Sequence, residues 1–215
     1  MARRLETLVV GPFEVNCHLY WDPDSRQGII IDPGAEGDRI LDAVRAGEFE
    51  PRAILLTHGH ADHIAAIRAV KERFDIPLYI GDGEQGLLAD PNANLSALIA
   101  DPVMAPEPNH LVTDDQVLSL GAMALRVLAT PGHSPAGVCY LDETEGVLFC
   151  GDTLFAGSIG RTDLPGGSLK LLLESIGSKI LSLPDGVICC PGHGPQTTVG
   201  AERVGNPFLV GGSFA

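Results

Sequence analysis

Four side chains that can bind a metal ion lie within six positions of the sequence. They are His58, His60, Asp62 and His63, in the stretch Thr57–His63. The whole chain has only seven histidines, so this local density is far above what chance would give. Because imidazole and carboxylate groups are common protein ligands of zinc and other transition metals, the stretch predicts a metal site.

The residues on either side of this stretch predict a turn between a strand and a helix. Residues 54–56 form a short apolar run typical of a buried strand, and the apolar residues from Ile64 to Val70 repeat at helical spacing. Gly59 and Ala61 are small, so the backbone can bend and the alternate imidazoles can converge. The last two candidate ligands begin the helix and point elsewhere, which suits two neighbouring metal ions better than one.

Three more metal-capable residues occur where an apolar strand stops at a glycine turn. They are His133, Asp152 and His193, each directly after a glycine. One such residue would be a weak signal, because Pro-Gly-His is more often a turn than a ligand. Together with the first stretch they give seven candidates, which are enough for two metal ions that share one bridging carboxylate.

Length, composition and charge limit the class of protein. A chain of 215 residues predicts one domain over residues 1–215, with a core large enough to need no disulfides. Its 45% hydrophobic and 20% charged residues are typical of a soluble globular protein. The net charge of -14 repels a phosphate backbone, so we expect no nucleic-acid partner.

The cysteines and the apolar runs indicate a compartment. The cysteines are odd in number, lie mostly inside apolar runs and lack the spacing of a disulfide framework, so we expect buried, reduced thiols: Cys17, Cys139, Cys150, Cys189 and Cys190. The first residues contain no apolar run long enough for a signal peptide, and no run approaches membrane-spanning length. We therefore expect a cytoplasmic protein without a membrane partner. The sequence leaves its oligomeric state open.

Two runs of strands, each accompanied by helices, are predicted. In the first half we expect strands at Leu8–Val10, Val15–Trp21, Gly28–Ile31, Arg52–Thr57 and Pro77–Ile80, with helices at Asp38–Ala46 and from Ile64 to about Phe74. In the second half we expect strands at Gln116–Leu120, Met123–Ala129, Val138–Leu141, Val147–Cys150 and Val187–Cys190, with a helix at Ser168–Leu183. Such a pattern suggests two sheets packed face to face with helices outside.

Residues 81–109 are cut into short pieces by four prolines. We expect one or two helices here, at Glu84–Ala89 and Leu95–Ala100, in a surface excursion near the substrate entrance. His110 follows this excursion and fits a loop or a strand edge. His18 fits a strand surface rather than a metal site, because no other candidate ligand clusters around it in the sequence.

The candidate ligands occur in an order that resembles the metallo-β-lactamase superfamily over nearly the whole chain. The resemblance implies a four-layer αββα sandwich, an α/β (α+β) fold, with two divalent metal ions at one edge. It implies that one ion is held by His58, His60 and His133, that the other is held by Asp62, His63 and His193, and that Asp152 bridges them. Zinc is the expected metal, although iron and manganese suit the same ligands.

Two longer motifs, residues 152–167 and 191–209, are similar to short, single-domain glyoxalase II-like hydrolases of the YcbL type. This similarity implies a thioesterase that converts S-D-lactoylglutathione, or a related small-molecule thioester, by means of a metal-bridging hydroxide. It also implies that Asp62 orients that hydroxide or briefly accepts its proton. A thiolate with a pKa of about 8.5 can leave without a strong general acid, which an amide nitrogen cannot, so the chemistry agrees with the resemblance.

Substrate binding is where the chain departs from full-length glyoxalase II. That enzyme grips glutathione with a C-terminal helical region, whereas only 22 residues follow His193. Arg161 stands where the family has a basic glutathione-contacting residue, and Asp163 stands where it has a tyrosine. We expect Arg161 to hold a substrate carboxylate, and an ion pair with Asp163 or Glu174 is the alternative.

A persulfide dioxygenase of the same superfamily is the alternative function. That enzyme holds one iron with two histidines and an aspartate, and its Gly-Arg-Thr-Asp loop matches Gly160–Asp163. It should also bring Pro-Ala-His-Asp near the C-terminus, whereas residues 191–194 are Pro-Gly-His-Gly, which favours the two-metal hydrolase. A β-lactamase proper lacks a carboxylate at the position of Asp152, a nuclease conflicts with the net charge, and a structural zinc site prefers cysteines.

Overall fold

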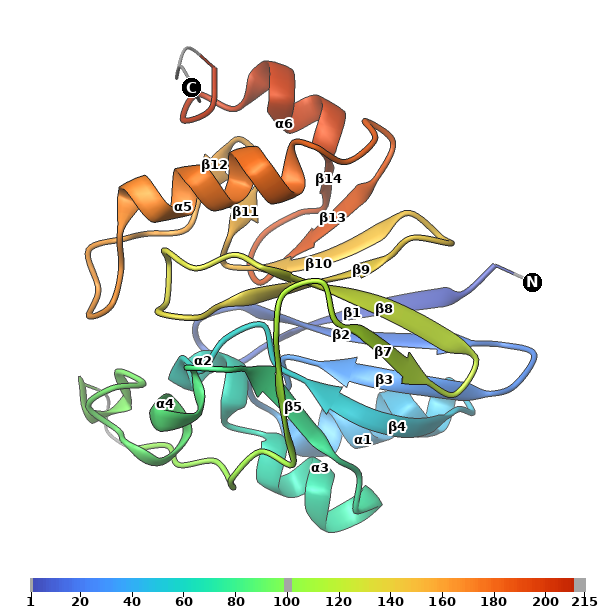
Figure 1. Ribbon diagram of the computed structural model, residues 1–215. Coiled ribbons are helices and arrows are strands. Elements are labelled where there is room, and N and C mark those ends of the chain that lie inside the picture. Colours follow the sequence, from blue (N-terminus) through green and yellow to red (C-terminus); the bar gives the residue numbers. More distant parts are fainter. Residues whose placement is uncertain (1, 99–101, 211–215) are drawn as a thin grey trace.

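Within residues 2–98 and 102–210, which the computed structural model describes, two six-stranded sheets stack face to face (Figure 1). Helices α1 and α3 cover the outer face of the first sheet, and α5 and α6 lie on the outer side of the second (Figure 1). The αββα sandwich predicted from the sequence is therefore confirmed.

The first sheet follows the chain order. It contains β1 (Arg4–Val10), β2 (Val15–Asp22), β3 (Gln27–Ile31), β4 (Glu50–Leu55), β5 (Leu78–Gly81) and β6 (His110–Val112). Strands β1 to β3 pair antiparallel, and β3 to β6 pair parallel. The helices α1 (Gly37–Ala46), α2 (Ala61–Ile64), α3 (Ile67–Phe74) and α4 (Gln85–Ala89) occupy the connections.

The second sheet has the order β14-β13-β10-β9-β8-β7. Its strands are β7 (Val117–Leu120), β8 (Met123–Ala129), β9 (Val138–Asp142), β10 (Val147–Gly151), β13 (Ile188–Pro191) and β14 (Thr197–Thr198). A small hairpin of β11 (Leu154–Phe155) and β12 (Ser158–Ile159) follows β10, and α5 (Leu169–Ser175) and α6 (Val199–Gly205) complete the fold.

Alternating residues of the central strands build separate layers of the core. In β2, Leu19 and Trp21 pack toward the helices of the first sheet, whereas Tyr20 points between the sheets. In β10, Phe149 points between the sheets, and Leu148 packs toward α5. This is the two-residue period of an extended chain, and it buries both faces of each strand.

The helix expected from Ile64 to Phe74 is broken in two. α2 ends at Ile64, and α3 begins at Ile67. The backbone N–H of Ala66 donates to the carbonyl oxygen of Pro33 at 2.9 Å instead of continuing a helical ladder. Because Pro33 is distant in the sequence, apolar periodicity could not predict this break.

Two further expectations need correction, and three short strands were not predicted. The helix expected over Ser168–Leu183 is α-helical only to Ser175 and continues as a π-helical turn at Ile176–Ile180. The described part of the helix expected at Leu95–Ala100 forms a 3₁₀ turn at Ser96–Leu98, and residues 99–101 lie outside the described residues. The two-residue strands β11, β12 and β14 were not predicted, because they are too short to show a period.

The cysteines are buried, reduced thiols, as the sequence predicts. All five cysteines are buried and free of disulfides. Among the described residues, no helix has the length and apolar character needed to cross a membrane.

We expect Phe149→Ala to lower the free energy of unfolding by about 3–5 kcal/mol, because it empties a site between the sheets where the Phe149 ring lies 5.2 Å from that of Tyr20. Phe208→Ala, at a half-exposed ring in the C-terminal segment, should change it by no more than about 0.5 kcal/mol. Urea unfolding followed by circular dichroism measures both. Equal losses would contradict the assignment of Phe149 to the inter-sheet core.

Candidate metal centre

Four turns at the ends of strands carry the candidate ligands. His58 and His60 follow β4, and α2 then supplies Asp62 and His63. The other three follow strands of the second sheet, so that both sheets contribute: His133 after β8, Asp152 after β10 and His193 after β13. The site therefore lies where the ends of the two sheets meet.

The seven candidates come together as three overlapping groups of possible ligands among the described residues. His58, His60 and His133 form the first group, which we name the first position; Asp62, His63 and His193 form the second position. Within each group the ligand atoms lie within 4.8 Å of one another. The third group contains Asp152 with one histidine of each position, which places this carboxylate between the two.

The distances inside each position suit a bound cation. Nδ1 of His60 lies 3.0 Å from Nε2 of His133, and Nε2 of His193 lies 3.3 Å from Oδ2 of Asp62. Two ligand atoms at the usual distance from a tetrahedral zinc ion lie about 3.3 Å apart. Oδ2 of Asp152 is 3.6 Å from Nε2 of both His133 and His193, so it reaches both positions.

Several polar atoms in the cluster are buried without a hydrogen-bond partner among the described residues. They are Nε2 of His58, both ring nitrogens of His63 and Oδ1 of Asp152. A buried polar atom without a partner costs about 1–3 kcal/mol, and four of them together are unusual. Cations at the two positions would accept the lone pairs of His58 Nε2, of one His63 nitrogen and of Asp152 Oδ1, so the residues fit two divalent ions.

Asp32 and Thr57 orient the first histidine. Oγ1 of Thr57 donates to Oδ2 of Asp32 at 2.7 Å, so the 3.1 Å contact between Thr57 Oγ1 and Nδ1 of His58 has the imidazole as donor. Nε2 of His58 then keeps a free lone pair toward the cluster. Oδ2 of Asp32 also lies 3.1 Å from Nδ1 of His63, an ion-pair contact without hydrogen-bond geometry, so one carboxylate contacts His63 directly and supports His58 through Thr57.

Arg161 reaches the site through its backbone. Its carbonyl oxygen accepts a 2.8 Å hydrogen bond from Nδ1 of His133, which leaves Nε2 of His133 for a cation. Its guanidinium is 63% exposed and forms two hydrogen bonds of 2.8 Å with the carboxylate of Asp163. The ion pair with Asp163 that the sequence left open is therefore present.

The turn that carries His193 is fastened to β2. Nδ2 of Asn16 donates to the carbonyl oxygens of Pro191 and Gly194 at 3.0 and 2.8 Å, and Nε2 of His18 lies 3.1 Å from the same Pro191 oxygen. His18 thus contacts the turn from behind and belongs to none of the ligand groups, as the sequence suggested. These contacts hold the backbone on both sides of His193.

Glycine is required where the turns approach one another most closely. A Cβ atom at Gly192 would lie 2.2 Å from Oδ1 of Asp152, and one at Gly151 would lie 2.3 Å from Oγ1 of Thr57. Gly151 also has a φ of +47°, which favours glycine. A side chain at Gly151 would push the ends of the two sheets apart, and one at Gly192 would displace Asp152 and His63.

Burial and charge divide the histidines into two kinds. Burial, followed by the neighbouring imidazoles, lowers the pKa of His58 well below its usual value and that of His60 to about 4. Both are therefore neutral at pH 7, the form that binds a metal. Burial also opposes a charge on His63, but Asp62, Asp152 and Asp32 outweigh it and raise the pKa of His63 well above its usual value. Three carboxylates that favour a proton here also favour a cation.

The two carboxylates of the cluster are held in the ionised form. Burial, the largest single effect, would raise the pKa of Asp62 and of Asp152, but His63 and the other neighbouring histidines together outweigh it and lower both values. Burial likewise opposes the charge of His193, whose pKa is raised by its hydrogen bond to Asp62. An ionised carboxylate beside a solvent-accessible cation position can bind a metal and accept a proton.

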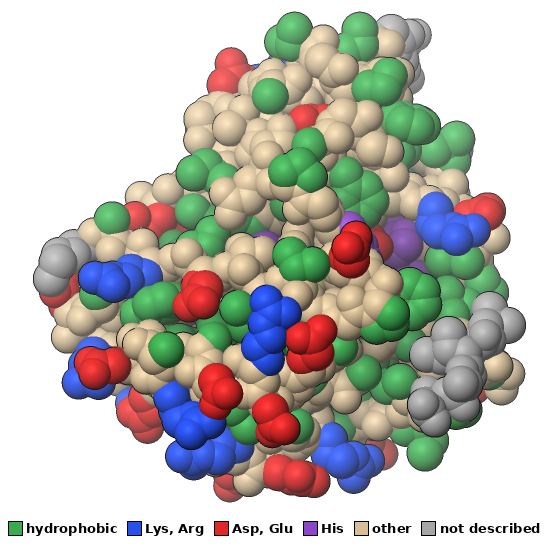
Figure 2. All heavy atoms as spheres, turned by 180° about the vertical axis from the view of Figure 1, so that it is seen from behind, with side chains coloured by type: hydrophobic (Ala, Val, Ile, Leu, Met, Phe, Trp, Pro, Cys, Tyr) green, Lys and Arg blue, Asp and Glu red, His purple; other side chains and the backbone are tan. Residues whose placement is uncertain are grey.

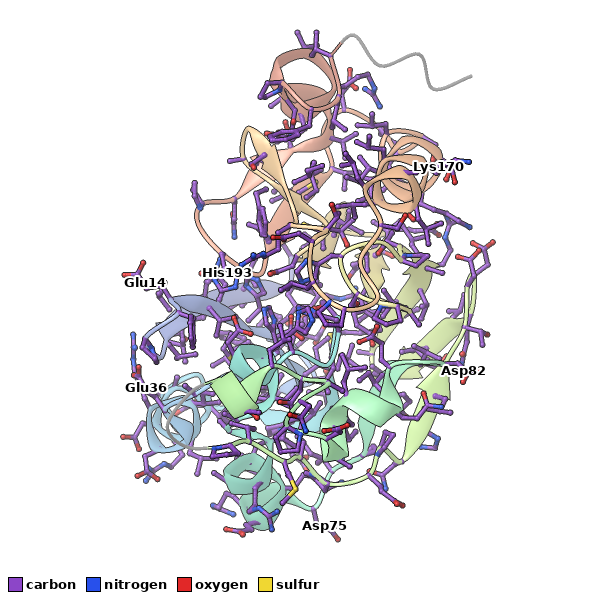
Figure 3. The ribbon with its side chains drawn as sticks, turned by 90° about the vertical axis from the view of Figure 1, so that its left-hand side faces the viewer. Glu14, Glu36, Asp75, Asp82, Lys170 and His193 are labelled. Atoms are coloured by element: carbon purple, nitrogen blue, oxygen red, sulfur yellow. The ribbon has the colours of Figure 1, made fainter. Side chains whose placement is uncertain are left out.

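The second position faces solvent. The side chains of Asp62 and His193 are 24% and 28% exposed, whereas those of His58, His60 and His133 are buried. Histidine side chains are visible on one face of the molecule, where its upper and lower parts meet (Figure 2). Figure 3 shows His193 between these two parts, on the same side as Glu14 and Glu36. A substrate can therefore approach from this side.

Sequence reasoning found the ligand candidates but missed the residues that hold them. Asp32 ends β3 at the same kind of strand end as Asp152, which is a signal that could have identified it. Asn16 and Glu84 gave no signal, because each acts through contacts with residues distant in the chain. His110 lies in β6 and stacks on Tyr79 at 4.6 Å, which agrees with the strand-edge interpretation.

Comparison with protein families identifies relatives of this chain. The family model of the metallo-β-lactamase superfamily matches residues 10–193. "Probable metallo-hydrolase YqgX" of Bacillus subtilis is 42% identical over 206 residues, covering 95% of this chain and 97% of that protein. "Hydroxyacylglutathione hydrolase GloC" of Haemophilus influenzae is 34% identical over 207 residues, covering 95% of this chain and 97% of that protein.

Solved structures show the same fold. The crystal structure described as BLEG-1 B3 metallo-β-lactamase is 42% identical, with a TM-score of 0.93 over 97% of this chain and 100% of that one. The structure of TTHA1623 in a di-iron-bound form is 36% identical, with a TM-score of 0.85 over 95% and 100%. ETHE1 from Myxococcus xanthus is 28% identical, with a TM-score of 0.80 over 98% and 86%.

We expect Asp62→Ala to reduce the bound metal from two ions per chain to one, because it removes a ligand of the second position only. Elemental analysis of protein purified without added metal gives the ratio. Asp82→Asn is the control, since this exposed carboxylate lies on the opposite side of the molecule from His193 in Figure 3. An Asp62→Ala protein that keeps the wild-type metal content would refute the assignment of this position.

Proposed function

The chain belongs to the metallo-β-lactamase superfamily, and from this premise we propose that it is a single-domain, metal-dependent thioesterase of the glyoxalase II type. Its substrates would be small-molecule thioesters such as S-D-lactoylglutathione. The observation that carries the proposal is the meeting of seven His and Asp side chains in two positions that share Asp152. Similarity to GloC supports the thioester, and the YcbL-type motifs of the sequence agree with it.

Two divalent cations at these positions would lower the pKa of a shared water and polarise the thioester carbonyl. The residues of the chain would position the reactants and move the proton of the water. Asp62, kept ionised beside His63 and His193, would orient the attacking water or briefly accept its proton. Because a thiolate is a good leaving group, no strong acid has to stand on the other side of the scissile bond.

The metal identity follows from the donor set only as a class. Imidazole and carboxylate ligands suit zinc, iron and manganese, and TTHA1623 has been observed with two irons. We propose two divalent ions, with zinc as the first candidate. The five buried free thiols suit a reducing compartment, so the proposal includes a cytoplasmic location.

An apolar recess beside Asp62 gives the acyl group a place. It has a volume of about 90 Å³ and is lined almost entirely by apolar groups, which include Phe13, Ala61, Ala65 and Val103. A cavity of about 150 Å³ accepts benzene, so this one suits a smaller group of a few carbon atoms. The lactoyl group of S-D-lactoylglutathione is of this size.

The similarity to BLEG-1 favours β-lactam hydrolysis as a second candidate function. That structure is described as a B3 metallo-β-lactamase and is 42% identical to this chain. Hydrolysis of a β-lactam also uses water and two cations, but it expels an amide nitrogen, which needs a proton donor that a thiolate does not. We therefore place the thioester first and include a cephalosporin in the substrate panel.

The persulfide dioxygenase alternative is supported by the Gly160–Asp163 loop. In the structure this loop contributes the Arg161 carbonyl oxygen to His133. The dioxygenase has a site for one iron, whereas this chain has a second candidate position, where Asp62 and His193 lie 3.3 Å apart. This second position favours the hydrolase. Oxygen uptake with glutathione persulfide tests the alternative directly.

We expect metal removal by a chelator to abolish thioester hydrolysis, and Zn²⁺, Fe²⁺ or Mn²⁺ to restore it. The panel contains S-D-lactoylglutathione, other acyl thioesters, a cephalosporin and glutathione persulfide, and the readouts are thiol release, β-lactam absorbance and oxygen uptake. Asp62→Ala should lower thioester turnover by at least about 100-fold. Oxygen uptake without thiol release from any thioester would contradict the thioesterase proposal and favour the dioxygenase.

We also expect Arg161→Ala to raise KM for S-D-lactoylglutathione about two- to fivefold with little change in kcat. The side chain of Arg161 is exposed, so its ion pair with a substrate carboxylate would contribute only modestly to binding. Asp163→Ala should lower KM, since it frees the guanidinium of Arg161 for a substrate carboxylate. Lys170→Ala is the control, because Lys170 lies far from His193 in Figure 3. An unchanged KM in both Arg161→Ala and Asp163→Ala would contradict the proposed role of Arg161 in substrate binding.

A further inference from the structure

Glu84 is a fully buried carboxylate outside the ligand set. Its Oε2 accepts a 2.9 Å hydrogen bond from the backbone N–H of Gly59, and its Oε1 accepts one of 2.7 Å from the backbone N–H of Ala136. Hydrogen bonds to an ionised acceptor are stronger than those between neutral groups. Both oxygens are therefore committed to the backbone, and each to a different loop.

These two loops hold the first position. Gly59 lies between His58 and His60, and Ala136 lies three residues after His133. The first loop follows β4 of one sheet, and the second joins β8 to β9 of the other. A single carboxylate thus connects the two sheets at the point where all three ligands of the first position leave the backbone.

The segment around Glu84 fits closely against both loops. A Cβ atom at Gly81 would lie 2.2 Å from the carbonyl oxygen of Ala136, and one at Gly83 would lie 2.8 Å from the Ala136 Cβ. A Cβ atom at Gly59 would lie 2.7 Å from Cβ of Leu87 in α4. Because only glycine allows these approaches, the segment after β5 is built to seat the Glu84 carboxylate between the loops.

We propose that Glu84 is a positioning residue of the first metal position: its carboxylate sets the spacing between the His58–His60 turn and the His133 loop, and with it the affinity for the first cation. The inference rests on the two-cation site of the proposed function. It adds a residue that touches neither metal nor substrate and acts through the ligand backbone.

Near the first position, two other bonds between the sheets stop short of its ligands among the described residues. The N–H of Val138 donates to the carbonyl oxygen of Thr57 at 2.8 Å, and Oη of Tyr140 donates to that of Leu56 at 2.8 Å. These two bonds join the strand ends. The backbone that follows Thr57 is held by the hydrogen bond of Glu84 to Gly59. The second position has a separate support in Asn16, whose amide holds the His193 turn.

Glu84→Gln provides the test. Glutamine has nearly the same shape, but one of its oxygens becomes an NH₂ donor, which must face the N–H of either Gly59 or Ala136. One loop then loses its bond. We expect the dissociation constant for Zn²⁺ at the first position to rise at least about tenfold and that at the second position to remain unchanged.

The measurement separates the two positions. Metal-free wild-type and variant proteins are titrated with Zn²⁺ against a competing chelator, and crystals with limiting Zn²⁺ give the anomalous occupancy of each position. Glu84→Asp, which keeps the charge but is one methylene shorter, should show the same selective loss to a smaller extent. Glu84→Gln with wild-type occupancy at the first position, or with equal loss at both, would overturn the proposal.

Two matched variants distinguish positioning from general destabilisation. Tyr140→Phe removes a buried bond between the sheets and should lower the Tm without changing either zinc affinity. Asn16→Ala should weaken the second position and spare the first. If wild-type protein binds one zinc ion only, at the first position, the two-cation function fails, yet the effect of Glu84→Gln on that ion remains measurable. A Tyr140→Phe variant that loses zinc as Glu84→Gln does would make Glu84 structural only.

Discussion

The gathering of five imidazoles and two carboxylates in one largely buried cluster is the constraint on which the rest of this structure depends. Polar atoms without partners are costly in a protein interior, and several nitrogens here have none among the described residues. This unfavourable free energy is confined to one edge of the sandwich, where four strand ends meet. Around that edge the sheets are packed from ordinary apolar residues, which supply the stability that the cluster does not.

The sandwich itself could be predicted because its central strands are long, apolar and separated by turn residues. β2, β8 and β10 appear within a residue or two of where the sequence placed them. The helix after the ligand turn could not be predicted correctly, since its break at Ala66 depends on a hydrogen bond to Pro33. Periodicity reports on burial along a segment, and it contains no information about a contact with a distant turn.

The same difference separates the ligands from the residues that support them. His133, Asp152 and His193 could be identified because each sits at a strand end, in an order that resembles a known superfamily. Glu84 could not, because its two partners lie 25 and 52 positions away in the chain. A carboxylate at the start of a short helix is usually solvated, and only the fold shows that this one is buried between two loops.

The two metal positions differ in solvent access, and this difference assigns them different tasks. The first position is enclosed by three buried histidines, one of which donates to Thr57 and another to the Arg161 carbonyl. The second is open through Asp62 and His193. Asp32 joins them, because it reaches His63 directly and His58 through Thr57. A cation at the enclosed first position would have a fixed electrostatic role, whereas one at the exposed second position would meet water and substrate, which agrees with the role proposed for Asp62.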